Sequence, residues 1–269
     1  MKEVIDVKNI LITGACGGMG DATVKILKNA GYNIYALDKK IENKHDGIMY
    51  YECDVTSLDS CQYVFEKIKE KCNHIDVIIH LAGIYDLNSL VEISEEDFVR
   101  IFNINLFGIY RINKLFLPLL SNKSKIIITS SELAPLDPLP FTGIYGITKT
   151  AVEKYAYSLR MELNLLGIKV VVLRPGAVKT NLLNISTDRL DNFVNNTSIY
   201  KCNAKKFKSI VDSVESKSKN PSVIGKKILR IIDKKNPKYI YNINRNILLK
   251  LLNILPCKLQ VFIIKQILK

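Results

Sequence analysis

Short, continuously apolar segments alternate with amphipathic segments along most of the chain, and this alternation limits the possible folds more than any other feature. Strands that are apolar on both sides fit a parallel sheet covered on both faces. The strands are expected at 9–13, 33–37, 48–51, 77–81, 125–129, 168–173 and 239–241. The helices are expected at 19–30, 57–71, 94–119 (one long helix ending near Pro118), 145–166, 222–233 and 246–268, the last broken at Pro256.

Right-handed crossovers between such strands predict an α/β fold of the Rossmann type, a doubly wound parallel sheet of about seven strands with helices on both faces. No internal repeat or linker divides the sequence, so a single domain over 1–269 is expected. Residues 181–220 are rich in Asn, Ser, Lys and Thr and predict a mobile loop or short helices beside the substrate. Residues 243–269 predict a C-terminal helical extension.

The net charge of +13 lies entirely in the C-terminal third, because residues 181–269 hold 18 Lys and Arg against 5 Asp and Glu. This excess fits a solvated Lys-rich surface, or attraction to an anionic substrate tail, an acidic partner or lipid headgroups. Nucleic acid is not an expected partner, because no reading motif or row of interleaved aromatic residues accompanies the lysines.

Neither a secretion signal nor an apolar stretch long enough for a membrane span is visible, so a cytoplasmic location is expected. The six cysteines form no CxxC pair and have no metal-ligand spacing. They are therefore expected to be free thiols, and no metal site is predicted.

A glycine-rich turn, Thr13 to Gly20, lies between the first expected strand and the first expected helix. Glycines let the backbone approach a pyrophosphate, and the helix N-terminus offers unpaired N–H groups and a positive dipole end. The turn predicts a dinucleotide site. Two spacings fit it: Gly14, Gly18 and Gly20, or Gly14, Gly17 and Gly20.

Asp38 ends the second expected strand, where a carboxylate can accept hydrogen bonds from both adenosine ribose hydroxyls and repel the 2′-phosphate of NADP. Gly17 supplies no positive side chain for that phosphate. Both features predict NAD, although Lys39 or Lys40 could instead reach a phosphate.

Asp54 follows the third expected strand and could accept from the adenine amino group, with Val55 beside the ring. Its alternative role is to cap the next helix, which Thr56 or Ser57 could also do.

Tyr145 and Lys149 lie four residues apart at the start of an expected helix and therefore on one face of it. A phenol is a poor base at neutral pH, but a nearby ammonium lowers its pKa, and an oxidised nicotinamide adds more positive charge. The pair follows the fifth expected strand, which ends in Thr129, Ser130 and Ser131. It therefore predicts a proton-transfer site.

These segments together resemble the short-chain dehydrogenase/reductase family over about residues 8–180. The motifs are Thr13 to Gly20, Asp54, Leu81-Ala-Gly83, Asn103 to Gly108, Ser131, Tyr145 with Lys149, and Arg174 to Thr180. The resemblance implies an enzyme that interconverts an alcohol and the corresponding carbonyl compound. NAD would carry the hydride, and no metal would be needed.

The resemblance also implies roles for single residues. Ser131 would hold the substrate oxygen, Tyr145 would be the general acid/base, and Lys149 would bind the nicotinamide ribose and tune Tyr145. Asn105 would hold a water that passes the proton to solvent, unless it only caps or kinks its helix. Ser130 could replace Ser131. The cofactor-binding set is Gly14, Cys16, Gly17, Gly18, Met19, Gly20, Asp38, Asp54, Val55, Ala82, Gly83, Tyr145, Lys149, Pro175, Gly176, Val178 and Thr180.

Two positions depart from the family pattern. His80 stands where the family usually has Asn, and it is expected to be buried and structural. Glu132 follows Ser131 in a stretch without the common glycine, and it could be a polar contact or simply solvated.

The substrate side is expected to be apolar, which favours a lipophilic secondary alcohol or ketone, steroid-like or lipid-like. Ser131, Leu133 and Tyr145 are expected to contact the substrate, and the C-terminal tail is similar to those of family members that act on steroids and retinoids. The full set of expected pocket residues is Ile84, Tyr85, Leu87, Leu133, Leu136, Leu139, Phe141, Leu182, Leu183 and Phe193.

Several alternatives stay open. The reaction could be that of a 3-oxoacyl-thioester reductase or a sugar-nucleotide epimerase or dehydratase, and a cofactor sensor without turnover is a further class. Residues 246–269 mix Leu and Ile with lysines, so they could lie on an anionic membrane, cover the substrate pocket, or form a subunit interface. The family resemblance implies a homodimer or homotetramer.

Overall fold

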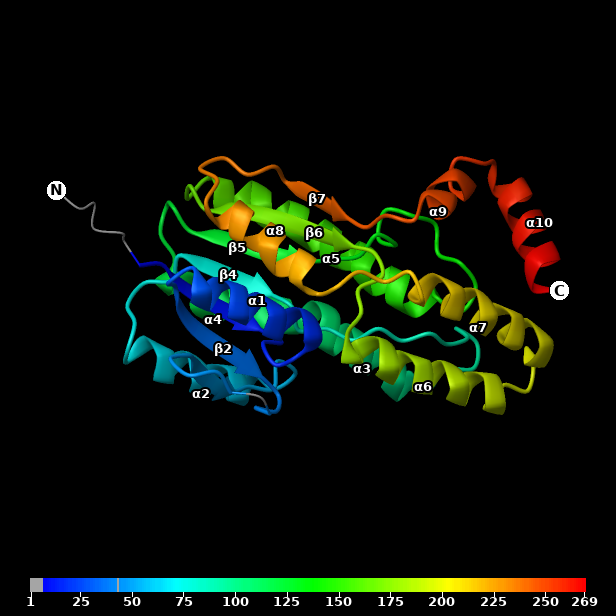
Figure 1. Ribbon diagram of the computed structural model, residues 1–269, viewed down its shortest axis with the longest axis horizontal. Helices are drawn as coiled ribbons and strands as arrows, with labels where there is room; N and C mark the ends of the chain where they lie inside the picture. The colour runs from blue at the N-terminus through cyan, green and yellow to red at the C-terminus, as the bar shows by residue number, and fades with distance from the viewer. Residues whose placement is uncertain (1–6, 43) are drawn as a thin grey trace.

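The computed structural model describes residues 7–42 and 44–269, without the side chains of residues 181–188. Seven parallel strands form one sheet in the order β3-β2-β1-β4-β5-β6-β7 (Figure 1). This arrangement confirms the predicted doubly wound α/β fold. The strands are β1 (Asn9–Thr13), β2 (Asn33–Asp38), β3 (Met49–Glu52), β4 (Val77–His80), β5 (Lys125–Thr129), β6 (Lys169–Pro175) and β7 (Ile240–Ile243).

Helices cover both faces of the sheet because successive strand residues point to opposite sides. On β1, Ile10 and Ile12 pack against α1 and α8, while Leu11 between them faces the opposite core, to which α2, α4 and α5 contribute. The helices are α1 (Gly18–Asn29), α2 (Leu58–Lys69), α3 (Glu95–Phe102), α4 (Gly108–Phe116), α5 (Gly143–Asn164), α6 (Asn181–Asn196), α7 (Lys201–Glu215), α8 (Ser222–Ile232), α9 (Ile247–Leu252) and α10 (Cys257–Leu268). Among the described residues, none of these helices combines the length and the apolar character that crossing a bilayer requires.

The prediction of one regular helix over 94–119 is wrong. A π-helical segment, Asn103–Phe107, separates α3 from α4, and a 3-10 turn, Leu117–Leu119, ends the run. The buried Asn105 explains the wider turn, since its side chain hydrogen-bonds the backbone of Ile84 instead of facing solvent. A π-bulge is a common way to place one side chain that a regular helix would direct elsewhere.

The prediction of a mobile loop or short helices over 181–220 is also wrong. Most of this stretch forms α6 and α7, two helices of 16 and 15 residues. The polar composition concealed a helical spacing at Ala204, Phe207 and Val211, which are all buried. Two packed helices, rather than a loop, therefore lie at the carboxyl end of the sheet (Figure 1).

His80 is buried, as expected from the sequence. Its Nε2 lies 2.8 Å from the Asn113 Oδ1. The Nδ2 of the same Asn113 side chain donates a hydrogen bond to the Tyr155 hydroxyl. Burial lowers the pKa of His80 to about 4, and the hydrogen bond to Asn113 offsets only part of that effect. The ring therefore stays neutral at physiological pH and bridges β4 to α4 and α5.

The His80 environment predicts an acid-sensitive stability. In the unfolded chain the ring gains a proton near its ordinary pKa of 6.5, whereas the folded chain resists protonation down to about 4. The free energy of unfolding should therefore fall as pH drops through this window, by about 3 kcal/mol in total. Urea titrations at stepped pH measure the effect. In His80→Asn most of this dependence of the free energy of unfolding on pH should disappear. The control His74→Asn, which changes a partly exposed histidine, should keep it. Equal slopes in the wild type and both variants would contradict the assignment to His80.

Candidate active site

A crevice of about 430 Å³ opens over the carboxyl ends of β1, β2 and β4. The crevice lies at β1, where the strand order reverses: β2 and β3 follow on one side of β1, and β4 to β7 follow on the other. Sheets of this kind bind ligands at such a switch point. A second cavity of about 180 Å³ continues from it toward α5 and α7, and Met19, Ala82, Gly83 and Thr180 line both. Every residue predicted to hold the cofactor lines one of the two cavities.

The glycine turn is shaped by contacts that leave no room for side chains at three positions. Gly14 has a φ of +68°, and a Cβ there would lie 2.5 Å from the Ala82 nitrogen. A Cβ on Gly20 would lie 1.9 Å from the Gly14 oxygen, and one on Gly18 would lie 2.8 Å from the Thr180 Cβ. A Cβ on Gly17 would approach nothing closer than 3.4 Å. The packing therefore requires the Gly14, Gly18, Gly20 spacing and leaves position 17 open to a side chain.

This difference predicts unequal effects of two alanine substitutions. Gly17→Ala should leave NADH binding within about twofold of the wild type, because an alanine there costs only a fraction of a kcal/mol at the helix cap. Gly20→Ala should weaken binding at least about tenfold, because the new methyl group collides with the Gly14 carbonyl and forces the turn open. Fluorescence titration with NADH measures both. Similar affinities for the two variants would mean that the turn does not hold the pyrophosphate.

The crevice fits a dinucleotide. The N-terminus of α1 has no side-chain cap, so its N–H groups face the crevice free for an anion. Asp38 lies at the far end, where its Oδ2 accepts a hydrogen bond from the Cys16 nitrogen at 2.8 Å. At the other end Thr129 lines the second cavity, and its buried Oγ1 has no hydrogen-bond partner among the residues that the structure describes.

Asp54 does not cap α2. Its Oδ1 accepts from the nitrogen and hydroxyl of Thr56, and its Oδ2 lies 2.7 Å from the Lys39 ammonium. Ser57 is the cap, accepting from the Ser60 nitrogen. Lys39 is largely exposed, so this ion pair is weak in energy. It nevertheless turns Lys39 toward Asp54, at the predicted adenine end of the crevice.

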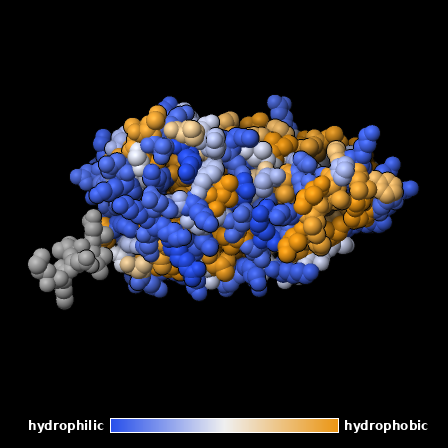
Figure 2. Space-filling view, turned by 90° about the horizontal axis from the view of Figure 1, so that it is seen from above, coloured by the Kyte–Doolittle hydropathy of each residue, from blue (hydrophilic) through white to orange (hydrophobic). Residues whose placement is uncertain are grey.

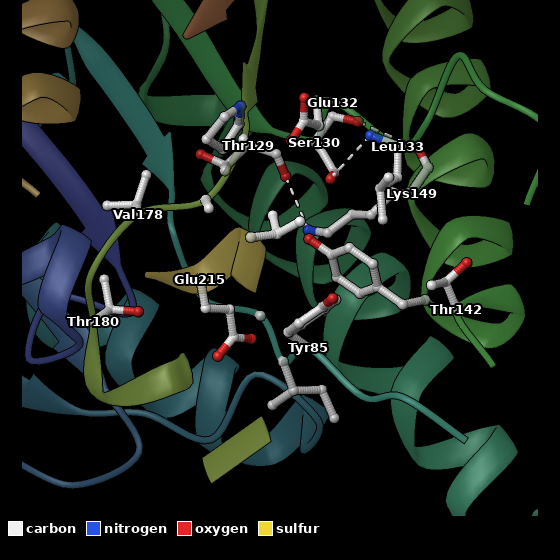
Figure 3. Close-up of a pocket in the computed structure, with 18 of the residues that line it drawn as sticks. Tyr85, Thr129, Ser130, Glu132, Leu133, Thr142, Lys149, Val178, Thr180 and Glu215 are labelled. Atoms are coloured by element: carbon white, nitrogen blue, oxygen red, sulfur yellow. Dashed lines mark hydrogen bonds between the residues drawn. The ribbon is translucent and has the colours of Figure 1, made fainter. Parts of the chain in front are cut away.

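Tyr145 and Lys149 lie together on the first turns of α5 and line the second cavity, as predicted. The Lys149 Nζ is 5.7 Å from the centre of the Tyr145 ring and donates to the Thr129 carbonyl at 3.1 Å (Figure 3). Tyr85 meets the Tyr145 ring edge-on, with ring centres 4.7 Å apart. These contacts fix the Tyr145 ring in the lining of the second cavity.

From the sequence, Lys149 is expected to lower the pKa of Tyr145. The groups of the protein instead raise that pKa. Burial raises the pKa of Tyr145 to about 12; the Ser131 hydroxyl acts in the opposite direction, and Glu132 adds to the rise. Burial also lowers the pKa of Lys149 to about 8. Loss of solvation outweighs the attraction between the two groups, because the ammonium lies against the ring and bonds a carbonyl. Tyr145 is therefore a protonated acid at neutral pH.

Ser130 and Ser131 both line the second cavity, but their hydroxyls have different partners. The Ser130 hydroxyl donates to the Glu153 carboxylate at 2.9 Å, and the same carboxylate is held by Arg174 at 2.7 Å. The Ser131 hydroxyl accepts from the Leu133 nitrogen at 3.2 Å and lies beside Tyr145. The Ser130 hydroxyl is therefore engaged by a partly buried ion pair, whereas the Ser131 hydroxyl is not.

Asn105 is fully buried in the π-helical segment and does not cap a helix. Its Oδ1 accepts from the Ile84 nitrogen at 2.8 Å, and its Nδ2 donates to the Ile84 oxygen and to the Thr148 hydroxyl. Its amide thus connects the strand end that carries Gly83 to the helix that carries Lys149.

The expected substrate residues are only partly correct. Ile84, Tyr85, Leu133 and Leu139 line the second cavity. Leu87, Phe141 and Phe193 instead pack into a small separate core, and Leu136 lines a minor hollow near Asn253. Phe141 has a φ of +65°, and its ring meets those of Phe193, Tyr200 and Phe207 within 5.0 to 5.3 Å. The side chains of Leu182 and Leu183 lie outside the described residues.

The sequence analysis missed the wall formed by α7 and α9. The helical spacing that defines α7 was the available signal, but its polar neighbours hid it. Leu249 of α9 completes this wall. The cavity residues from α7 are Phe207, Ile210, Val211, Val214 and Glu215 (Glu215 is labelled in Figure 3).

Glu132 is buried, so the alternative of a solvated side chain is wrong. Its Oε2 accepts from the Asn246 nitrogen, which joins the loop after β5 to the start of α9. Burial raises the pKa of Glu132, against the effect of that hydrogen bond and of Arg245.

Comparison with known proteins gives consistent matches over most of the chain. The sequence model of the short chain dehydrogenase family matches residues 8–191. A probable short-chain type dehydrogenase/reductase of Helicobacter pylori, VdlC, is 32% identical over 254 residues, covering 91% of this chain and 92% of that protein. The 3-ketodihydrosphingosine reductase of Bacteroides thetaiotaomicron is 28% identical, covering 86% and 85%. A solved short chain dehydrogenase family protein from Francisella tularensis superposes with a TM-score of 0.73 at 21% identity, covering 88% and 97%.

Proposed function

Because this chain belongs to the short-chain dehydrogenase/reductase family and is an NAD(P)-dependent oxidoreductase, we propose that it uses NAD to interconvert a lipophilic secondary alcohol and its ketone. The observation that carries the proposal is the Tyr145 phenol, which lines a mainly apolar cavity that adjoins the glycine crevice. Tyr145, Lys149, Ser131 and Asn105 are the proposed catalytic residues.

Bound NAD supplies or accepts the hydride. During ketone reduction Tyr145 donates its phenolic proton to the substrate oxygen, and Ser131 donates a hydrogen bond to the same oxygen. The raised pKa of Tyr145 supports the direction of reduction, because the phenol keeps its proton at neutral pH. Lys149 remains largely charged below its pKa of about 8, so it stabilises the phenolate that forms. Asn105 positions the backbone at Ile84. It is proposed to hold a water molecule through which Tyr145 regains a proton from solvent.

The preference for NAD over NADP rests on Asp38 and Gly17. The Asp38 carboxylate lines the crevice at the proposed adenosine end and would repel a 2′-phosphate. Gly17 contributes no cation there, and Lys39 is turned toward Asp54. The Asp38 carboxylate and the lack of a cationic side chain at position 17 favour the unphosphorylated ribose.

The lipophilic substrate is supported by the cavity lining beyond Tyr145. Helices α7 and α9 and the loop after β5 contribute apolar side chains to this lining, namely Phe207, Ile210, Val211, Val214, Leu249, Leu133 and Leu139. The Bacteroides relative is named for a sphingoid ketone, which agrees with an apolar pocket of this kind.

Absorbance of NADH followed across a panel of ketones tests the proposal. Steroid or long-chain ketones should show kcat/KM at least about tenfold above short polar ketones and sugars, because each buried methylene adds to transition-state binding, and NADPH should be the poorer donor. Faster turnover of 3-oxoacyl thioesters would select the reductase alternative. Turnover of sugar nucleotides without net NADH consumption would select the epimerase alternative.

A single domain, a homo-oligomer and a cytoplasmic location complete the proposal. The oligomer is supported by aromatic and apolar side chains exposed on neighbouring outer helices. These are Phe107, Tyr110, Tyr157 and Met161.

A further inference from the structure

Residues 245–269 form a surface that is both apolar and basic. The segment contains five Lys and Arg residues and no Asp or Glu. Figure 2 shows the apolar part as a broad orange area at the right-hand end of the molecule, where α9 and α10 lie. Eight large apolar residues of the segment each expose 43 to 75% of their surface: Ile247, Leu248, Leu251, Ile254, Leu259, Val261, Phe262 and Ile267.

Only one face of α10 packs on the protein. Gln260, Ile264 and Leu268, spaced four residues apart, face α7; the first and last are buried, and the Asn203 side chain donates to the Leu268 oxygen. The opposite face carries Leu259 and Phe262, and along its edge Lys258, Lys265 and Lys269 are spaced seven and four residues apart. An apolar stripe with lysines along its edge is typical of helices that lie in a lipid headgroup layer.

The exposed surface continues into the cavity. On α9 the Leu249 side chain lines the cavity, while Ile247, Leu248 and Leu251 are exposed. Ile210 on α7 both lines the cavity and exposes 41% of its surface. The surface is also held firmly, because Asn246 bonds Glu132 and the Asn253 side chain accepts from the Asp137 nitrogen. An apolar wall therefore runs from the Tyr145 side of the cavity to the outside.

We propose that residues 245–269 dock the enzyme on an anionic lipid bilayer, and that its lipophilic substrate passes from the bilayer along Leu249 and Ile210 into the cavity. Buried apolar side chains and cations near acidic headgroups both contribute to such binding. A second copy fits the surface less well, since a two-fold contact would place five cations against five cations.

The substrate route rests on the proposed function, whereas the bilayer contact does not. Vesicle binding needs neither cofactor nor turnover, so the two claims can fail separately.

Cosedimentation of the full chain with vesicles tests the contact. The wild type should bind phosphatidylcholine vesicles that contain phosphatidylserine, bind phosphatidylcholine alone at least about tenfold less, and be released by added salt. The variant Leu248→Gln/Phe262→Gln/Lys258→Glu/Lys265→Glu changes only exposed side chains and leaves Leu249 in place. It should lose at least about tenfold in partitioning while its melting temperature and NADH affinity stay unchanged.

A matched control carries the same kinds of change on α2, Leu58→Gln/Tyr63→Gln/Lys67→Glu/Lys69→Glu, where the apolar residues are also exposed. It should bind vesicles like the wild type. The proposal is overturned by three results: no wild-type binding to the anionic vesicles, an equal loss in the control, or a C-terminal variant that changes only the oligomeric mass in sedimentation equilibrium.

The route is tested with two ketones. For a long-chain ketone embedded in anionic vesicles the C-terminal variant should turn over at least about fivefold more slowly than the wild type. For a short water-soluble ketone the two should be equal. Equal rates on the embedded ketone, with vesicle binding lost, would reject the route alone.

Discussion

Replacing Tyr145 with phenylalanine should reduce turnover by about three orders of magnitude while NADH still binds. The substitution removes a phenolic hydroxyl from the lining of the apolar cavity and keeps the ring that packs on Tyr85. General acid catalysis contributes on the order of 10² to 10⁴ in rate, and no other phenol on α5 lines the cavity within the described residues. Steady-state reduction of the best ketone from the panel, together with NADH titration, measures the two effects.

The controls for Tyr145→Phe separate chemistry from packing. Ser130→Ala removes a hydroxyl that faces Glu153, so it should retain most activity, whereas Ser131→Ala should lose about tenfold or more. A Tyr145→Phe enzyme with near-normal turnover and an unchanged melting temperature would remove Tyr145 from the mechanism.

The pH profile of wild-type reduction follows from the same site. Tyr145, with its pKa raised to about 12, stays protonated through neutral pH and causes no loss of rate there. Lys149, with its pKa lowered to about 8, loses its charge as pH rises through that value. The rate of reduction should therefore be level from about pH 6 and decline above about pH 8. In Lys149→Arg, where the charge persists, the decline should move to higher pH.

The second large effect is a change of cofactor preference. In Asp38→Ser/Gly17→Arg, affinity for NADH should fall about tenfold to a hundredfold and affinity for NADPH should rise by a similar factor. Loss of a charged hydrogen bond to the ribose costs about 1.5 to 3 kcal/mol, and a new guanidinium can bind the 2′-phosphate. Position 17 can accept the new side chain, because a Cβ there would meet only the Gly14 oxygen, at 3.4 Å.

The single substitutions serve as controls for the double variant. Asp38→Ser alone should weaken NADH binding, partly because the Cys16 nitrogen loses its acceptor. Gly17→Arg alone should improve NADPH binding only modestly, since Asp38 still repels the phosphate. A wild type that binds NADPH as tightly as NADH would contradict the role given to Asp38.

Periodicity in the sequence was sufficient to identify the strands, most of the helices and the order of the site motifs. Strands such as Lys125–Thr129 are buried on both faces, so their apolar character is continuous and easily distinguished from helices. The long helix over 94–119 was predicted wrongly because a long-range contact, Asn105 with Ile84, outweighed the local pattern. The loop over 181–220 was predicted wrongly because the polar composition hid the helical spacing of Ala204, Phe207 and Val211.

What the sequence by itself determined is the parallel α/β sheet, the glycine turn at its first crossover, and the pair of Tyr145 and Lys149 at the start of α5, because all three depend on neighbours within a few residues. Only the tertiary structure decided which glycines are closely packed, which serine is engaged by Glu153, and how α7 and α9 close the cavity. It also decided the acidity of Tyr145. Each of these depends on atoms that approach from distant parts of the chain and exclude water, and no local pattern records those approaches.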